Sequence, residues 1–367
     1  MKKQIDSLTG LRIFAALSIF LWHSQSYFFK INAFAPFYLA GAVPLFFVLS
    51  GFVLTISGMR GRSWGDFFVA RIARIWPAHF GAFILLFVAF WPWTKYWFHS
   101  INSLRDMFFN LTLTQAWIPK KSILESFNGV SWSISAEMFF YAIFPLILRL
   151  MRLHPLETII STLLLTSASM MLVNWISPNI DAGLFGAMSP ISGLSAFALG
   201  VFSGTQFERH KTSGEHSFAR WTIIEAGTLI TVALINGIMV NLPPIIDQPI
   251  LSTFLRTMMG PAFSYALLIV VFALSRGAFS RITSNRMLVY LGEVSFSFYL
   301  VHQVVIRWYS DKKTLFGNIS NSSGFIITLA ISLFIAIGMF HFIEGPARRR
   351  IITAWNLRKR TSQAKFS

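Results

Sequence analysis

The dominant pattern in this 367-residue chain is a series of long apolar runs separated by short polar or basic segments. A helix needs about 20 mostly apolar residues to cross the roughly 30 Å hydrocarbon core of a bilayer. Runs of that length lie at 8–29, 39–58, 75–94, 132–150, 156–177, 184–206, 221–240, 256–276, 286–308 and 322–344. The pattern predicts an all-α, polytopic membrane protein with about ten transmembrane helices.

The composition agrees with a membrane protein and narrows the chemistry. Hydrophobic residues make up 54% of the chain and charged residues 12%, whereas soluble domains carry roughly 25% charged residues. Cysteine is absent, which excludes disulfides, thiolate catalysis and cysteine-based metal sites. The eight histidines are scattered, with no pair at the close helical spacing that metal ligation from one helix needs. We therefore expect no metal.

The formal net charge of +17 could suggest a nucleic-acid partner. The basic residues, however, lie at the ends of the apolar runs and in the last 20 residues, where contact with membrane lipids explains them better. Of the 31 lysines and arginines, 21 lie at one set of run ends and eight at the opposite set. This asymmetry predicts that both termini are cytoplasmic and that no nucleic acid is bound.

A basic residue and a histidine interrupt the first apolar run. Arg12 and His23 are eleven positions apart, which places them on one helix face, about 16 Å from each other. Arg12 could be a topology anchor whose side chain reaches the cytoplasmic edge, and His23 could be a hydrogen-bonded residue of the bundle. Histidine titrates near neutral pH and is the usual base for a hydroxyl proton, so His23 is also a catalytic candidate.

A second polar group opens the run at 132–150. Trp132 and Ser133 lie at its outer end, and Ser133, Glu137 and Tyr141 recur every four residues on one face. An acid inside the membrane costs about 2.5–3.5 kcal/mol unless it is paired or faces water, so Glu137 is a functional candidate. The alternative is a helix N-terminus, capped by Ser133 and favouring Glu137 through the helix dipole.

Arg71 and Arg74 lie one turn apart at the cytoplasmic end of the third run. They could simply reflect topology, but two guanidiniums at this spacing also suit a phosphate-rich ligand arriving from the cytoplasm. Ser50 could line a site or, with Gly51, permit close helix packing. His302, at the depth of His23, could be a bundle residue or part of the same chamber.

These segments, taken in order, resemble the acyltransferase-3 family, whose members are membrane-bound and acylate bacterial surface glycans. The motifs are Ile5-Asp6-Ser7-Leu8-Thr9-Gly10-Leu11-Arg12, the Arg12–His23 spacing, 46–52, Arg71-Ile72-Ala73-Arg74-Ile75-Trp76-Pro77, 132–137, 292–302 and Glu344-Gly345-Pro346. The resemblance covers nearly the whole chain. It implies ten core spans in the bacterial cytoplasmic (inner) membrane, an acyl-CoA donor reached from the cytoplasm, and a sugar acceptor on the outer side.

The resemblance also assigns residues. It implies that Arg12 and His23 are the essential pair, that Arg71 and Arg74 bind the donor, and that Trp132, Ser133 and Glu137 line the site. Many relatives have a second acid after the glutamate, where this chain has Met138, so a mechanism with two carboxylates is not expected. We expect an acyltransferase-3 type transmembrane domain at 1–347 and a basic cytoplasmic tail at 348–367, without an esterase-like domain, as in stand-alone members of the family.

The resulting hypothesis is an O-acyltransferase that moves an acyl group, expected to be acetyl, from acyl-CoA to a sugar hydroxyl of a surface polysaccharide or its lipid-linked precursor. His23 would be the general base, Glu137 would orient it or balance its charge, and Arg12 would contact the donor. A covalent acyl-enzyme on His23 or Ser50 fits the same residues. Acyl-CoA would be a substrate, and no cofactor would be bound permanently. The alternatives are a transporter or flippase for a lipid-linked sugar and a structural role in polysaccharide export.

Overall fold

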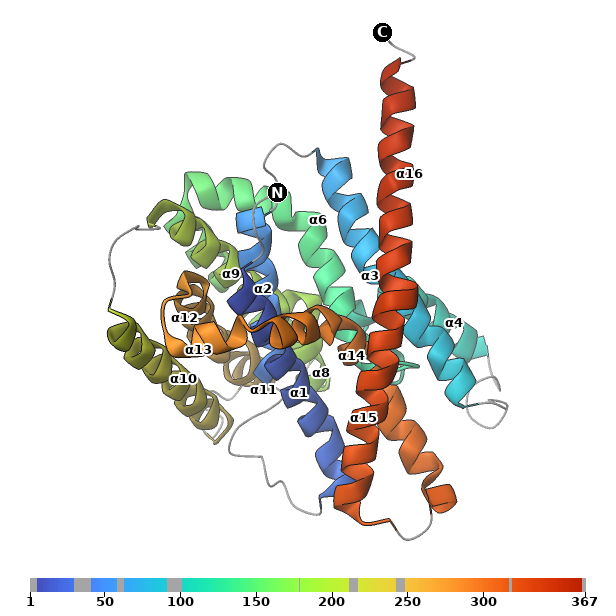
Figure 1. Ribbon diagram of the computed structural model, residues 1–367. Coiled ribbons are helices and arrows are strands. Elements are labelled where there is room, and N and C mark those ends of the chain that lie inside the picture. The colour runs from blue at the N-terminus through green and yellow to red at the C-terminus, as the bar shows by residue number, and fades with distance from the viewer. Residues whose placement is uncertain are drawn as a thin grey trace.

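The computed structural model describes residues 5–29, 41–57, 63–90, 101–177, 179–210, 217–241, 248–316 and 319–364. These residues form helices joined by short connections and include no strand (Figure 1). The long helices are α1 Asp6–Phe28, α2 Ala42–Ser57, α3 Trp64–Ala89, α6 Trp132–Leu153, α7 Pro155–Ile176, α9 Pro190–His210, α10 Phe218–Asn241, α12 Gly260–Leu274, α14 Arg286–Asp311, α15 Asn321–Met339 and α16 Gly345–Ala364. The all-α prediction is confirmed.

Shorter helices fill the connections. They are α4 Ile101–Leu111, η4 Gln115–Trp117, α5 Lys121–Leu124, η5 Gly129–Ser131, α8 Ala182–Met188, α11 Pro249–Phe254, η6 Leu255–Met259, α13 Ala278–Thr283, η7 Lys313–Phe316 and η8 Phe340–Glu344. Residues 101–131, between α3 and α6, are folded into four of these short pieces.

Eight helical segments of the described residues are long and apolar enough to cross a membrane, which confirms a polytopic membrane protein. Two further predicted runs, 8–29 and 39–58, correspond to α1 and to the 16-residue helix α2 in the part of the chain that the structure describes. The prediction of ten spans and of two cytoplasmic termini stays a prediction. One boundary differs: α3 begins eleven residues before the predicted 75, because Ser63 and Asp66 form a capping box in the polar segment.

Close backbone contacts between helices build the centre of the bundle. α9 is the most deeply placed of the eight candidate spans, with 78% of its most apolar window buried. It packs on α2 through Gly51 and Gly200, where an added Cβ would lie 2.2 and 2.0 Å from carbonyl oxygens of the facing helix. Lipid is as apolar as a helix surface, so helices in membranes associate through such close packing at small residues. Gly51 is therefore a packing residue.

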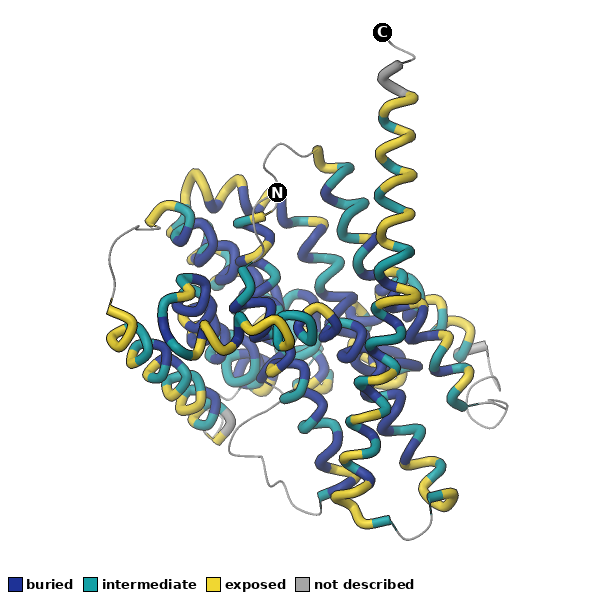
Figure 2. The backbone as a smooth tube through the Cα atoms, in the orientation of Figure 1, coloured by how far each residue is buried: buried dark blue, intermediate teal, exposed yellow. Residues whose placement is uncertain are grey.

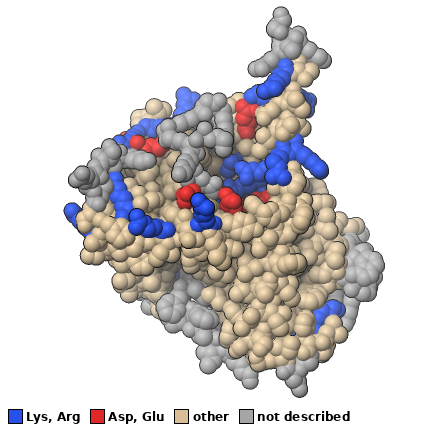
Figure 3. Space-filling view, in the orientation of Figure 1, with Lys and Arg blue, Asp and Glu red and all other residues tan. Residues whose placement is uncertain are grey.

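The periphery differs from the centre in both burial and charge. Figure 2 shows the central helices largely buried, whereas α10 and the upper part of α16 carry many exposed positions. On the face in Figure 3, lysines and arginines gather in the upper half, around the foot of α16, and the lower half carries few. This distribution agrees with the unequal numbers of basic residues at the two sets of run ends.

Candidate active site

A carboxylate with two hydroxyl donors lies between α2 and α6. Glu137 and Tyr141 are one turn apart on α6, and the Tyr141 hydroxyl donates a hydrogen bond to Glu137 Oε1. Ser50 Oγ, from α2, donates to the same oxygen over 3.0 Å. Gly51 turns toward α9, so its neighbour Ser50 faces α6. Ser50 thus contacts a candidate site residue, and Gly51 permits close helix packing.

Arg12 projects from α1 toward this carboxylate. Its guanidinium interacts electrostatically with Glu137, Glu344 and Tyr141, and also with the cation Arg74. The half-buried Arg12 therefore has two carboxylates as neighbours, which offsets the cost of placing a charge inside the bundle.

Arg71 and Arg74 extend this group along α3. The Arg71 guanidinium lies 5.8 Å from the ring centres of both Phe67 and Tyr141, within the range of cation–π contact. Its Nε is buried and has no hydrogen-bond acceptor among the described residues. Arg74 and Arg348 are further electrostatic neighbours of Arg71. An excess of guanidiniums with an unused donor is suited to an anionic ligand.

Glu344 belongs to this group as well, although we had not predicted it as a site residue. It is 4% exposed, and Ser297 Oγ of α14 donates to its Oε2 over 2.8 Å. It ends the π-helical turn η8, and its electrostatic neighbours are Arg74, Arg12 and Arg348. A glutamate at the end of the last apolar run was the signal that could have identified it.

His23, farther along α1, and His302 of α14 form a separate cluster. The ring centres of His23 and His302 are 5.3 Å apart, and Phe20 and Phe298 pack against the His302 ring. His302 is fully buried, with Nδ1 2.7 Å from the Tyr299 carbonyl oxygen. A neutral ring donates its proton there, which leaves the lone pair on Nε2. No described residue is a hydrogen-bond partner of that nitrogen.

Ser133 and Trp132 lie at the start of α6, and Ser133 is linked to His302 through Tyr299, whose ring centre is 5.8 Å from that of His302. Ser133 Oγ is 2.8 Å from the Tyr299 hydroxyl, which itself donates to the Val130 carbonyl oxygen. Trp132 is buried with its ring edge-on to Phe47. Tyr299 therefore connects α6 to α14, and it also interacts electrostatically with Glu137.

The predicted charged and histidine side chains thus form two clusters, and Glu137 belongs to the one that contains the arginines. We call Arg12, Arg71, Arg74, Glu137 and Glu344 the arginine cluster, and His23 with His302 the histidine pair. Within the described parts of the chain, His23 and Glu137 share no hydrogen bond. The three helical turns between Arg12 and His23, about 16 Å, separate the clusters along α1.

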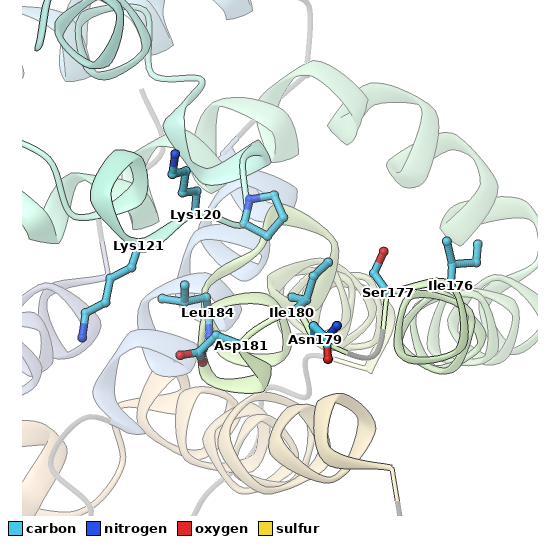
Figure 4. Close-up of a pocket in the computed structure, with 9 residues that line it drawn as sticks. Lys120, Lys121, Ile176, Ser177, Asn179, Ile180, Asp181 and Leu184 are labelled. Carbon is cyan, nitrogen blue, oxygen red and sulfur yellow. Dashed lines mark hydrogen bonds between the residues drawn. The ribbon is translucent and has the colours of Figure 1, made fainter. Parts of the chain in front are cut away.

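One surface pocket lies away from both clusters. A cavity of about 650 Å³ opens between the segment after η4 and the α7–α8 connection, and none of the predicted site residues lines it. Figure 4 shows Lys120, Lys121 and Asp181 among its lining residues. Asp181 Oδ1 accepts the Leu184 amide and so caps α8. The described residues contain no group of three or more side chains that could hold a metal ion.

Comparison with known proteins gives a consistent result. Residues 5–341 match the family described as an acyltransferase domain. Acyltransferase MdmB of Streptomyces mycarofaciens is 29% identical over 94% of this chain and 92% of its own length. YrhL of Bacillus subtilis (strain 168), whose name describes a peptidoglycan O-acetyltransferase, is 30% identical over 47% of this chain and 28% of its own length. No solved structure matches. The chain belongs to the acyltransferase-3 family of membrane O-acyltransferases.

Proposed function

We propose that this enzyme transfers an acyl group, expected to be acetyl, from acyl-CoA to a sugar hydroxyl of a surface polysaccharide or its lipid-linked precursor. The observation that carries the proposal is the placement of two clusters on one helix. Arg12 of α1 joins a group rich in guanidiniums, and His23, three turns along the same face, joins a histidine pair. This separation of the two clusters suits a long donor with phosphates at one end and a thioester at the other.

The arginine cluster would hold the phosphates of the donor. Arg71 offers an unused Nε–H, and Arg74 lies one turn away on α3. Guanidiniums bind phosphate oxygens through paired, charge-assisted hydrogen bonds. Because most of the basic residues lie at this end of the spans, the donor would come from the cytoplasm of a bacterial cell, across its inner membrane.

The histidine pair would carry the proton transfer. His23 would take the proton of the acceptor hydroxyl while the hydroxyl oxygen attacks the thioester carbonyl carbon. The carbon–sulfur bond then breaks, and the departing thiolate takes a proton from His23. The lone pair on His302 Nε2 supplies a hydrogen-bond acceptor next to the reacting groups. Ser133, which contacts the Tyr299 hydroxyl next to His302, and Trp132 would line the acceptor end of the site.

The contacts of Glu137 favour a different role from the one that the sequence suggested. Its neighbours are Ser50, Tyr141 and Arg12 rather than His23. We therefore propose that Glu137 balances the charge of Arg12 and fixes its position, so that Arg12 contacts the donor within the bundle. The names of the relatives, an acyltransferase and a peptidoglycan O-acetyltransferase, support acyl transfer to a glycan hydroxyl.

The test is a His23→Gln variant assayed in membrane vesicles with labelled acetyl-CoA and the glycan of the host. We expect loss of transfer with normal amounts of folded, membrane-inserted protein. His79→Gln is the matched control, because His79 is also a buried histidine but contacts the Asn110 carbonyl oxygen outside both clusters. Transfer retained by His23→Gln would contradict the proposal.

The acceptor can be identified independently of the assay. The mass of the surface polysaccharide, compared between cells with and without this protein, should differ by one acyl unit per modified sugar. An unchanged mass, with the protein present and folded, would exclude that polysaccharide as the acceptor.

A further inference from the structure

The last helix remains attached to α3 after it leaves the bundle. α15, the π-helical turn η8 and α16 follow one another without a break from Asn321 to Ala364, and α16 rises beyond the rest of the molecule (Figure 1). Its attachment point is Asp66 in the first turn of α3. Asp66 accepts hydrogen bonds from Trp355 Nε1 over 2.8 Å and from Lys359 Nζ over 2.8 and 2.9 Å. We call these three residues the Asp66 clasp.

The register of the two helices places Arg348 beside the donor-binding arginines. Gly65 packs against the Trp355 ring, and Gly81 packs against Ile343. The helices therefore run antiparallel between these two contacts. Arg74 on α3 and Arg348 on α16 each lie a little past halfway from the first contact to the second, and so at the same level.

The face of α16 that carries the clasp also carries Arg348. Trp355 and Lys359 follow Arg348 by seven and eleven positions, which returns each of them to within about 20° of the same helix direction. The clasp therefore turns Arg348 toward α3. In agreement, the electrostatic neighbours of Arg348 are Arg74, Glu344 and Glu293, and Arg71 interacts with it as well.

Bringing a third guanidinium close to two others is unfavourable unless an anion lies between them. Glu344 offsets part of the charge, but its carboxylate already accepts from Ser297 and also faces Arg12 and Arg74. Glu137 balances Arg12, and Glu293, the other acidic neighbour of Arg348, is exposed to solvent. A ligand with several phosphate groups would complete the balance.

We propose that α16 is part of the donor site: Arg348 supplies a third guanidinium for the phosphates of the donor, and the Asp66 clasp is a positioning device that holds it there. This inference rests on the proposed function, because it takes acyl-CoA as the donor. It gives a binding role to a segment that the sequence indicated only as a basic tail.

The direct test is Arg348→Gln, assayed by transfer from acetyl-CoA in vesicles. One charge-assisted contact at a partly exposed site predicts an increase in KM for acetyl-CoA of about five- to tenfold, with kcat within about twofold of wild type. Adenosine 3′,5′-bisphosphate, which carries phosphates without the pantetheine arm, should weaken as a competitive inhibitor by a similar factor. Arg350→Gln, two positions along and on the opposite side of α16, is the matched control and should leave both constants unchanged.

The clasp is tested from the α16 side, because Asp66 also caps α3. Lys359→Gln should raise KM for acetyl-CoA about two- to fivefold without lowering kcat, Lys359→Arg should restore the wild-type value, and Arg358→Gln should have no effect. An Arg348→Gln enzyme with wild-type KM and wild-type inhibition by the bisphosphate would overturn the inference. If the wild-type enzyme transfers nothing from acetyl-CoA, the proposed function fails instead, so the two failures are distinguishable.

Discussion

The hydroxyl groups of Ser50 and Tyr141, which both donate to Glu137, allow a quantitative test of the arginine cluster. In Tyr141→Phe, the ring that packs against Arg71 stays and only the hydroxyl that donates to Glu137 is lost. A hydrogen bond to a charged group contributes about 1.5–3 kcal/mol. If Glu137 positions Arg12 for the transfer step, this loss lowers kcat by about 10- to 100-fold, since 1.4 kcal/mol corresponds to a factor of ten.

Ser50→Ala removes the other donor to the same oxygen, over 3.0 Å, and should cost a comparable amount. Because both hydroxyls act on one atom, the effects should not add. The effect of the double variant should differ from the sum of the single effects by at least about 0.5 kcal/mol. A loss of all measurable activity in Ser50→Ala alone would instead favour the covalent route through Ser50.

The assay is the initial rate of acetyl transfer in vesicles that contain equal amounts of folded enzyme. Tyr265→Phe is the matched control: Tyr265 is buried and its hydroxyl donates to Asn236 Oδ1 over 3.2 Å, between α12 and α10. It should alter stability but not kcat. Tyr141→Phe with a kcat within twofold of wild type would refute the role that we give to Glu137.

Two further predictions concern stability. Glu225, buried on α10, accepts the backbone amides of Gly277, Phe279 and Ser280 over 2.8–3.1 Å; Glu225→Gln retains one acceptor oxygen and should destabilise the fold by about 1–3 kcal/mol, measured as a lower unfolding temperature in detergent. The control Glu208→Gln weakens a 3.4 Å surface pair with Arg152 and should change little, so equal unfolding temperatures for the two variants would show that the Glu225 contacts are not stabilising. Gly200→Ala places a Cβ 2.0 Å from the Val48 carbonyl oxygen and should destabilise by about 1–3 kcal/mol. Gly227→Ala on α10, with nothing within 4 Å of the added atom, should be neutral, and a tolerated Gly200→Ala would mean that α2 and α9 are not tightly packed.

Hydropathy and the order of the motifs were sufficient to predict the class of the protein and the type of its secondary structure. Apolar runs of membrane-spanning length can satisfy their backbone groups in lipid only as helices or closed barrels, and their length selects helices. The ordered motifs also indicated the family, which residues 5–341 then confirmed. The start of α3 was placed too late, because hydropathy does not register a helix that begins in a polar, capped segment.

Which of the polar residues contact each other depends on how the helices pack. Ser50 and Gly51 are neighbours in the sequence, but α2 packs between α6 and α9. Ser50 therefore contacts Glu137 of α6, and Gly51 contacts the backbone of α9. The same packing separates His23 from Glu137, pairs it with His302, and brings Glu344 and Arg348 to the arginines of α3. These contacts join residues far apart in the chain, and local periodicity carries no information about which helix faces which.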